Sequence, residues 1–235
     1  MSAILSYTPF RCNYSLIYLI LRFDYSDRTL RFKTSTPQTE FANAKVISSI
    51  VLALYTISQD ASQNSDTIKL VDSINSFGST VIKGAYCVYE PSCQFRLFNP
   101  SIAKRPGVVI EVAWSRPWKV LEKKMSDLLE VGGGMTRAVI GVELVESAPG
   151  HMKVFLSFWR LGAPYEVVWD RAEIGADDER ALCLTLSDFI SRDTCANYFP
   201  RAELETEILI PLGKIYQSAQ WGFELWQEEK QQDEI

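Results

Sequence analysis

A run of ten residues, PGVVIEVAWS from Pro106 to Ser115, constrains the fold of this chain more than any other stretch. Its apolar residues form an almost unbroken series around Glu111, which is typical of a strand covered on both faces. A carboxylate in that position loses its hydration, so it must be paired with a cation, hydrogen-bonded or bound to a metal. The run therefore predicts a strand of a buried sheet that carries one compensated glutamate.

Helices and strands are predicted to alternate on either side of this strand. In chain order they are a β-hairpin (15–23 and 29–34), a helix (37–57), strands at 81–89 and 108–114, a helix (118–131) and a strand (137–145). Thr36 followed by Pro37 is a typical helix start, and Gly132-Gly133-Gly134 is a typical helix end. This order predicts an α/β fold with a central mixed sheet flanked by helices.

The last third of the sequence predicts an extension of that core. MKVFLSFW and YEVVWD have the pattern of a β-hairpin, ELETEILI from Glu203 that of a half-exposed strand, and Pro211 begins a final helix. No linker or repeat interrupts the chain. We therefore expect a single domain over residues 1–235, with a core at about 29–146 and a C-terminal extension at about 147–235.

Composition limits the classes of function. The chain has 235 residues, 47% of them apolar, and a net charge of −5, so it has no general attraction to nucleic acid or to anionic membranes. SLIYLILRF at 15–23 is too short to cross a bilayer, and we expect no membrane partner. Five scattered cysteines without a CxxC pair suit reduced thiols in an intracellular compartment, cytoplasmic or nuclear. His151 is the single histidine, which excludes a multi-histidine metal site.

The helix predicted at 118–131 carries one lysine on its apolar side. At 100° per residue, Lys124 falls inside the arc of apolar side chains, which are Val120, Leu121, Met125, Leu128 and Leu129. One interpretation aims the ammonium group of Lys124 at Glu111. The other lays the lysine stem along the edge of the core and brings its head group to water.

The helix predicted at 37–57 has an acidic residue near its start. Its predicted apolar face consists of Ala44, Ile47, Val51, Leu54 and Tyr55. Glu40 lies on the same side, so it is a candidate site residue. The alternative is an ordinary first-turn acid that the helix dipole favours.

Several of these residues together resemble the PD-(D/E)XK restriction-endonuclease-like superfamily, and more closely the endonuclease-domain proteins predicted in fungal and bacterial genomes. The resemblance covers about residues 29–146, and its residues are Glu90-Pro91-Ser92, the strand at 106–115, Lys124, Gly132 and the strand at 138–141. It implies a restriction-endonuclease-like core in which two carboxylates hold Mg²⁺ or Mn²⁺. A lysine in such a site helps to activate water for phosphodiester hydrolysis.

The resemblance makes Glu111, Lys124 and Glu40 candidate catalytic residues, and Glu111, Glu90 and Ser92 candidate metal ligands. Ser92 stands where the family has its first metal-binding aspartate, and a neutral hydroxyl replaces a carboxylate poorly. Ala113 stands where the family has its lysine, so Lys124 is expected to serve from the following helix.

The function expected from this degenerate motif is that of a divergent, metal-dependent, nuclease-like phosphodiesterase acting on nucleic acid, with weak or no cleavage. One alternative is a non-catalytic interaction module that retains the nuclease fold. Another has no nuclease ancestry, and there Glu111 and Lys124 form a structural ion pair.

A local excess of basic residues suggests where nucleic acid would bind. Between residues 104 and 124 the exposed candidates are Lys104, Arg105, Arg116, Lys119 and Lys123. Phosphate groups favour such a surface. The same residues are equally compatible with an ordinary solvated loop and helix face.

Overall fold

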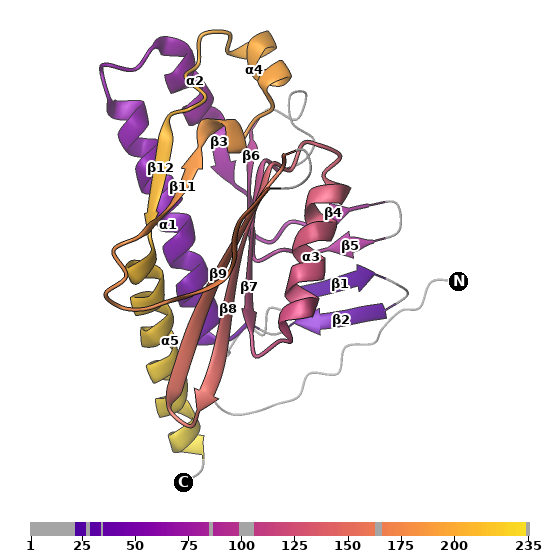
Figure 1. Cartoon of the computed structure of the whole chain (residues 1–235), viewed down its shortest axis with the longest axis vertical. Coiled ribbons are helices and arrows are strands. Elements are labelled where there is room, and N and C mark those ends of the chain that lie inside the picture. Colours follow the sequence, from indigo (N-terminus) through magenta and orange to yellow (C-terminus); the bar gives the residue numbers. More distant parts are fainter. Residues whose placement is uncertain are drawn as a thin grey trace.

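The strand that carries Glu111 lies inside a six-stranded sheet (Figure 1). The computed structural model describes residues 22–26, 29–33, 35–84, 87–98, 106–162 and 166–233. The strands of the sheet, in spatial order, are β10 (Glu166–Ile174), β9 (His151–Arg160), β8 (Ala138–Ala148), β7 (Val108–Trp114), β6 (Cys93–Leu97) and β3 (Ile74–Ser76). Strands β7 and β8 are parallel, whereas the other neighbours are antiparallel. The sheet is mixed and central, which confirms the predicted fold class.

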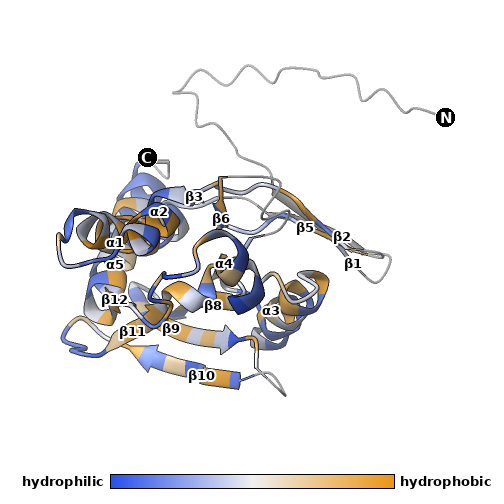
Figure 2. Ribbon diagram, turned by 90° about the horizontal axis from the view of Figure 1, so that it is seen from above, coloured by the Kyte–Doolittle hydropathy of each residue, from blue (hydrophilic) through white to orange (hydrophobic). Residues whose placement is uncertain are grey.

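Helices cover both faces of this sheet (Figure 2). Helices α1 (Pro37–Gln59) and α5 (Leu212–Asp233) lie on one face, and α3 (Trp118–Val131) lies on the other. Side chains of β7 alternate between the two layers: Val108, Ile110 and Val112 belong to the core under α1 and α5, and Val109 and Ala113 to the core under α3. Both faces of β7 are therefore apolar, because both are covered.

The remaining elements surround this core. A second sheet has the order β2-β1-β5-β4, and a hairpin pairs β11 with β12. Their bounds, with those of the short helices, are β1 (Arg22–Ser26), β2 (Thr29–Lys33), α2 (Ser65–Ser73), β4 (Ile82–Lys83), β5 (Val88–Tyr89), β11 (Ala181–Thr185), η1 (Leu186–Asp188), α4 (Arg192–Tyr198) and β12 (Glu207–Pro211).

The structure differs from the expected strands in three ways. The hairpin of β9 and β10, which was predicted as part of a C-terminal extension, belongs to the central sheet itself and brings it to six strands. The single strand predicted at 81–89 is two short strands, β4 and β5, which pair with each other, and Gly84 N–H donates to the Cys87 carbonyl. Most of the strand predicted at 15–23 lies outside the described residues.

Helix α1 turns a different face to the core from the one predicted. Its buried apolar residues are Ala42, Val46, Ile50, Leu54 and Ile57, whereas the predicted face members Ala44, Val51 and Tyr55 are exposed. The helix is apolar almost all round, so periodicity alone could not select the buried side. By length and composition α1 could cross a membrane, the one such helix in the described part of the chain, yet its inner face packs on the central sheet.

A buried carboxylate–lysine centre

The pairing of β7 with its neighbours leaves room beside Glu111 on the α3 side. In strand β7, Glu111 has the same parity as Val109 and Ala113, which face α3. Its partner on β8 is Gly141, where an added Cβ would lie 2.5 Å from the sulfur of Met125. Because position 141 has no side chain, α3 can approach the sheet closely next to the carboxylate.

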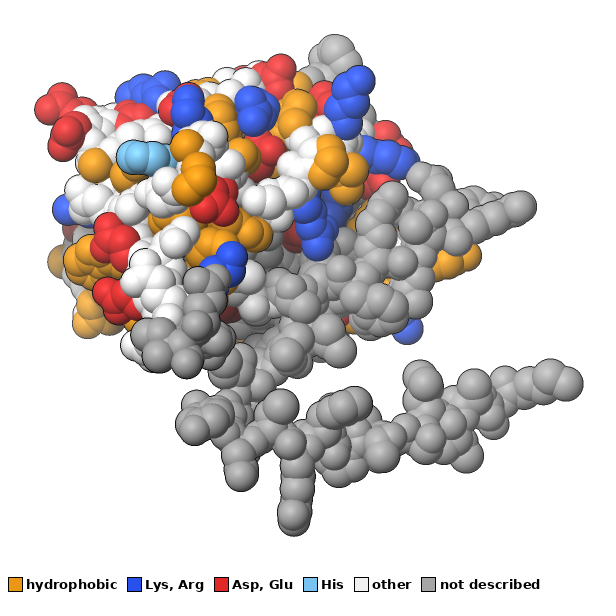
Figure 3. Space-filling model, turned by 90° about the horizontal axis from the view of Figure 1, so that it is seen from below, with side chains coloured by type: hydrophobic (Ala, Val, Ile, Leu, Met, Phe, Trp, Pro, Cys, Tyr) orange, Lys and Arg blue, Asp and Glu red, His pale blue; other side chains and the backbone are white. Residues whose placement is uncertain are grey.

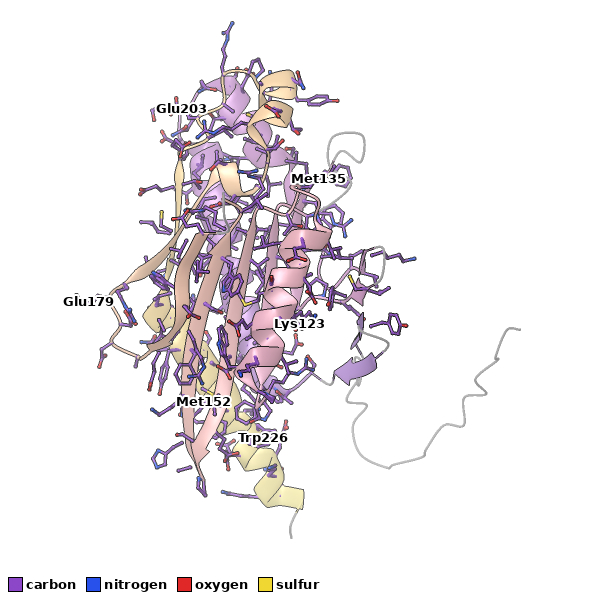
Figure 4. All side chains as sticks on the ribbon, turned by 45° about the vertical axis from the view of Figure 1, so that its right-hand side comes forward. Lys123, Met135, Met152, Glu179, Glu203 and Trp226 are labelled. Carbon is purple, nitrogen blue, oxygen red and sulfur yellow. The ribbon has the colours of Figure 1, made fainter. Side chains whose placement is uncertain are left out.

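The close contact between α3 and the sheet brings Lys124 to Glu111. Its Nζ lies 2.9 Å from Glu111 Oε1, and the two side chains are only 6% and 1% exposed. The same ammonium group donates to the backbone carbonyl of Glu90 at 3.4 Å and lies 5.8 Å from the centre of the Tyr89 ring. The interpretation with a solvated lysine head is therefore wrong for Lys124. The neighbouring Lys123 is exposed on α3 (Figure 4).

Position 92 lies at the second oxygen of the same carboxylate. The Ser92 backbone N–H donates to Glu111 Oε2 at 3.2 Å, and the Ser92 hydroxyl accepts from Val112 N–H at 2.9 Å. The Asn43 side-chain amide of α1 donates in turn to the Ser92 carbonyl at 3.4 Å. The turn before β6 is thus bonded both to the strand of Glu111 and to α1.

The other two predicted site residues take more ordinary positions. Glu90 contributes its backbone carbonyl to Lys124, as described above. Glu40 lies in the first turn of α1 and accepts a hydrogen bond from the Ser35 hydroxyl, as expected of a first-turn acid. From α1 it is Asn43 that reaches the turn at Ser92. Sequence reasoning missed Asn43, although a buried amide among apolar neighbours is a usable signal.

This donor set does not fit a divalent metal ion. Mg²⁺ requires about six oxygen ligands at roughly 2.0–2.1 Å, usually including more than one carboxylate. Both Glu111 oxygens already accept from Lys124 and Ser92, and the Ser92 hydroxyl is bonded to the β7 backbone. Within the described ranges, no group of three or more His, Cys, Asp or Glu residues could hold a metal.

The predicted nucleic-acid surface is only partly described. Lys104 and Arg105 lie outside the described residues. Lys119 and Lys123 are exposed one turn apart on α3, and Arg116 is half-buried just before the helix. Lys123 forms an ion pair with Asp127 at 3.4 Å, so part of this positive charge is balanced locally.

Comparison with known proteins gives only weak structural similarity. No protein-family model and no curated protein matches the chain. A crystal structure from Anabaena variabilis, described as a "putative nuclease belonging to DUF820", superposes with a TM-score of 0.47 and 9% sequence identity, covering 84% of this chain and 90% of that one. A score below 0.5 is too low to assign a function, so the proposals below rest on the residues of this chain.

Proposed function

We propose that this chain is a non-catalytic protein that retains a nuclease-like fold, and that Glu111 and Lys124 form a structural ion pair in place of a metal site. The supporting observation is the 2.9 Å contact between two almost fully buried groups. The charge of the carboxylate is balanced inside the protein. A divalent ion added here would have to compete with Lys124 for a carboxylate that is already paired, which is costly.

The other buried carboxylates support this interpretation. In the described part of the chain, the carboxylates classed as buried are those of Glu111, Glu143 and Asp188. Glu143 pairs with Arg171 at 2.8 Å, and Asp188 pairs with Arg160 at 2.7 Å. Each buried carboxylate therefore has its own cation, and Glu111 follows the rule that buried charges are paired.

Calorimetric titration with MnCl₂ tests the proposal. We expect no binding heat that differs between the native chain and Glu111→Gln. Ser92→Asp is the informative third variant. It places a second carboxylate beside Glu111, so that two carboxylates face one lysine, and it should therefore create Mn²⁺ binding. Mn²⁺ binding by the native chain that is lost in Glu111→Gln would overturn the proposal in favour of a metal-dependent nuclease.

Incubation of plasmid DNA and single-stranded RNA with Mg²⁺ or Mn²⁺ gives an independent measurement. We expect no cleavage by the native chain. Matched Glu111→Gln and Lys124→Met preparations distinguish a contaminating nuclease from an intrinsic one, because a contaminant would persist in both variants. Cleavage that requires both residues would contradict the structural role.

Binding of nucleic acid without cleavage is a second candidate function, supported by the exposed pair Lys119 and Lys123 on α3. Fluorescence anisotropy with labelled duplex DNA and RNA measures it, and the affinity should fall as salt is raised. Lys119→Glu should weaken binding, whereas Lys69→Glu on α2, another exposed lysine, should not. Equal affinities for the two variants would remove α3 as the binding surface.

A further inference from the structure

Arg171 on β10 is held by two contacts that fix its guanidinium group. Its Nε–H donates to Glu143 Oε2 at 2.8 Å, and the Glu143 side chain on β8 is only 3% exposed. Its Cζ lies 3.8 Å from the centre of the Phe155 ring, so one face of the group stacks on an aromatic side chain. An arginine at a surface normally keeps many rotamers, whereas these contacts leave Arg171 with few. The guanidinium group is therefore positioned before any ligand arrives.

The backbone at Arg171 has an unfavourable conformation that directs the side chain to these contacts. In the pairing of β10 with β9, the register shifts between Trp169 and Ala172. Asp170 and Arg171 of β10 fall there opposite the single residue Ser157 of β9, which makes a β-bulge. Arg171 has a φ of 48°, a left-handed conformation that glycine adopts more easily than arginine. Because bulges redirect side chains and such strain is typical of functional positions, the bulge points to a use for this arginine.

Two other arginines that pair with shielded carboxylates use more of their guanidinium groups. Arg160 bonds Asp188 through Nε and Nη2, at 2.7 and 3.0 Å, and its Nη2 also donates to a backbone carbonyl. Arg180 bonds Asp178 through the same two nitrogens and likewise donates to a backbone carbonyl. Arg171 bonds its carboxylate through Nε alone, and neither of its terminal nitrogens has a hydrogen-bond partner among the residues that the structure describes. The first two pairs are typical of structural ion pairs, and the third leaves donors for a ligand.

We propose that the terminal edge of Arg171, formed by its two Nη groups, is a binding site for a single phosphate group. These nitrogens present parallel N–H donors, an arrangement that two oxygens of a phosphate accept. The side chain is 36% exposed, so a small ligand can reach it from solvent. Because Glu143 and Phe155 already hold the guanidinium group, binding costs little side-chain entropy. The site goes beyond the role proposed for Glu111 and Lys124 and does not depend on it.

The charges around Arg171 decide which phosphate ligand to expect. Asp170 and Glu173, on either side of it on β10, are both exposed. Lys153 pairs with Glu173 at 3.2 Å, so its charge is balanced locally. A nucleic-acid strand along this edge would bring further phosphates against the two carboxylates, whereas one phosphate group would meet the arginine alone. We therefore expect a small phosphate monoester as the ligand, with millimolar affinity for inorganic phosphate, since a single guanidinium edge binds it.

Titration of the native chain with sodium phosphate at constant ionic strength tests the site, with arginine side-chain N–H signals followed by heteronuclear NMR. The Nε–H signal of Arg171 is the one that Arg171→Lys removes. It should shift saturably with phosphate and stay in place with sodium chloride. A signal that does not move, or that moves equally with both salts, would overturn the proposal. Tighter binding of a DNA duplex that is lost in Arg171→Lys would also overturn it, in favour of a nucleic-acid surface.

Two variants separate phosphate binding from the stability of the fold, with the backbone amide signal of Ala172 as the reporter. Arg171→Lys keeps a cation for Glu143 but lacks the edge of paired donors, so it should bind phosphate at least about tenfold more weakly. Arg180→Lys is the matched control and should bind phosphate as the native chain does, because the Arg180 guanidinium group is already bonded at two points. Equal affinities of the two variants would refute the site.

Phenylglyoxal, which modifies accessible guanidinium groups, gives a measurement that needs no substitution. Phosphate should slow the modification of Arg171 in the native chain several-fold and leave the modification of Arg180 unchanged. Peptide mass mapping after a short reaction distinguishes the two residues. Equal protection of both arginines, or protection of neither, would contradict a phosphate site at Arg171.

Discussion

Replacing Lys124 by methionine should destabilise the protein far more than replacing its neighbour Lys123. Methionine keeps the length of the stem but removes the charge, so the Glu111 carboxylate would stay 1% exposed, would keep the Ser92 N–H as a donor, and would lose its lysine partner. Removing one partner of a buried ion pair costs about 3–5 kcal/mol. Lys123 forms an exposed pair with Asp127 at 3.4 Å, and such pairs are worth at most about 1 kcal/mol.

Urea unfolding followed by tryptophan fluorescence measures this difference. With a slope of about 2–3 kcal/mol per molar, Lys124→Met should lower the midpoint by roughly 1–2.5 M. The double variant Glu111→Gln with Lys124→Met should recover about 1–3 kcal/mol relative to the sum of the single losses, because no buried charge remains unpaired. The reasoning fails if Lys124→Met costs no more than Lys123→Met, or if the two single losses simply add.

Three further outcomes follow from contacts elsewhere in the structure. Gly222→Ala should lower the free energy of unfolding by about 1–3 kcal/mol in urea, since the added Cβ would lie 2.6 Å from the Gln38 Cα. Gly175→Ala is the control and should be nearly neutral, because its added Cβ would meet nothing within 4 Å. Asn43→Ala should lower the free energy of unfolding by about 1 kcal/mol in the same measurement. The variant loses the hydrogen bond to Ser92, and this loss is partly offset because a buried amide oxygen without a bond is removed as well. Burial raises the pKa of the Cys195 thiol, with a smaller contribution from Asp66, so it should react slowly with Ellman's reagent until the chain unfolds. The unfolded thiol loses its proton more readily, so stability should fall as the pH rises through the ordinary thiol pKa.

The sequence predicted those elements whose residue pattern is compatible with only one local structure. The run around Glu111 allowed only a strand covered on both faces, and it is β7. The helix at 118–131 matches α3 at both ends. Lys124 lay inside a narrow apolar arc, so its direction followed once α3 packed on the sheet. These three features together bring Lys124 to Glu111.

The parts that could not be predicted depend on tertiary contacts. Helix α1 is apolar on nearly every side, so its buried face is chosen by the sheet and α5 rather than by its own periodicity. The split of 81–89 into β4 and β5 depends on pairing with β1, which a local pattern cannot indicate. Asn43 enters the site only because α1 lies over the turn at Ser92.

One face of the molecule shows no gathering of charge of a single sign. On the face seen from below, basic and acidic side chains are mixed among apolar ones rather than gathered by sign (Figure 3). Binding of a polyanion to this face would therefore depend on a few residues and not on a broad field. This makes single substitutions on α3 more informative than changes in overall charge.

Under the proposed function, the charges around Glu111 make position 92 the decisive one for metal binding. Two carboxylates and one lysine leave one negative charge, which favours a bound cation. One carboxylate and one lysine leave none, and the low exposure of both groups makes any added ion costly. Serine at position 92 then has a different use, since its N–H and hydroxyl bond Glu111 and Val112. Under the proposed function, serine at position 92 therefore belongs to a centre that holds β7, α3 and the turn before β6 together, and aspartate there would favour a bound cation.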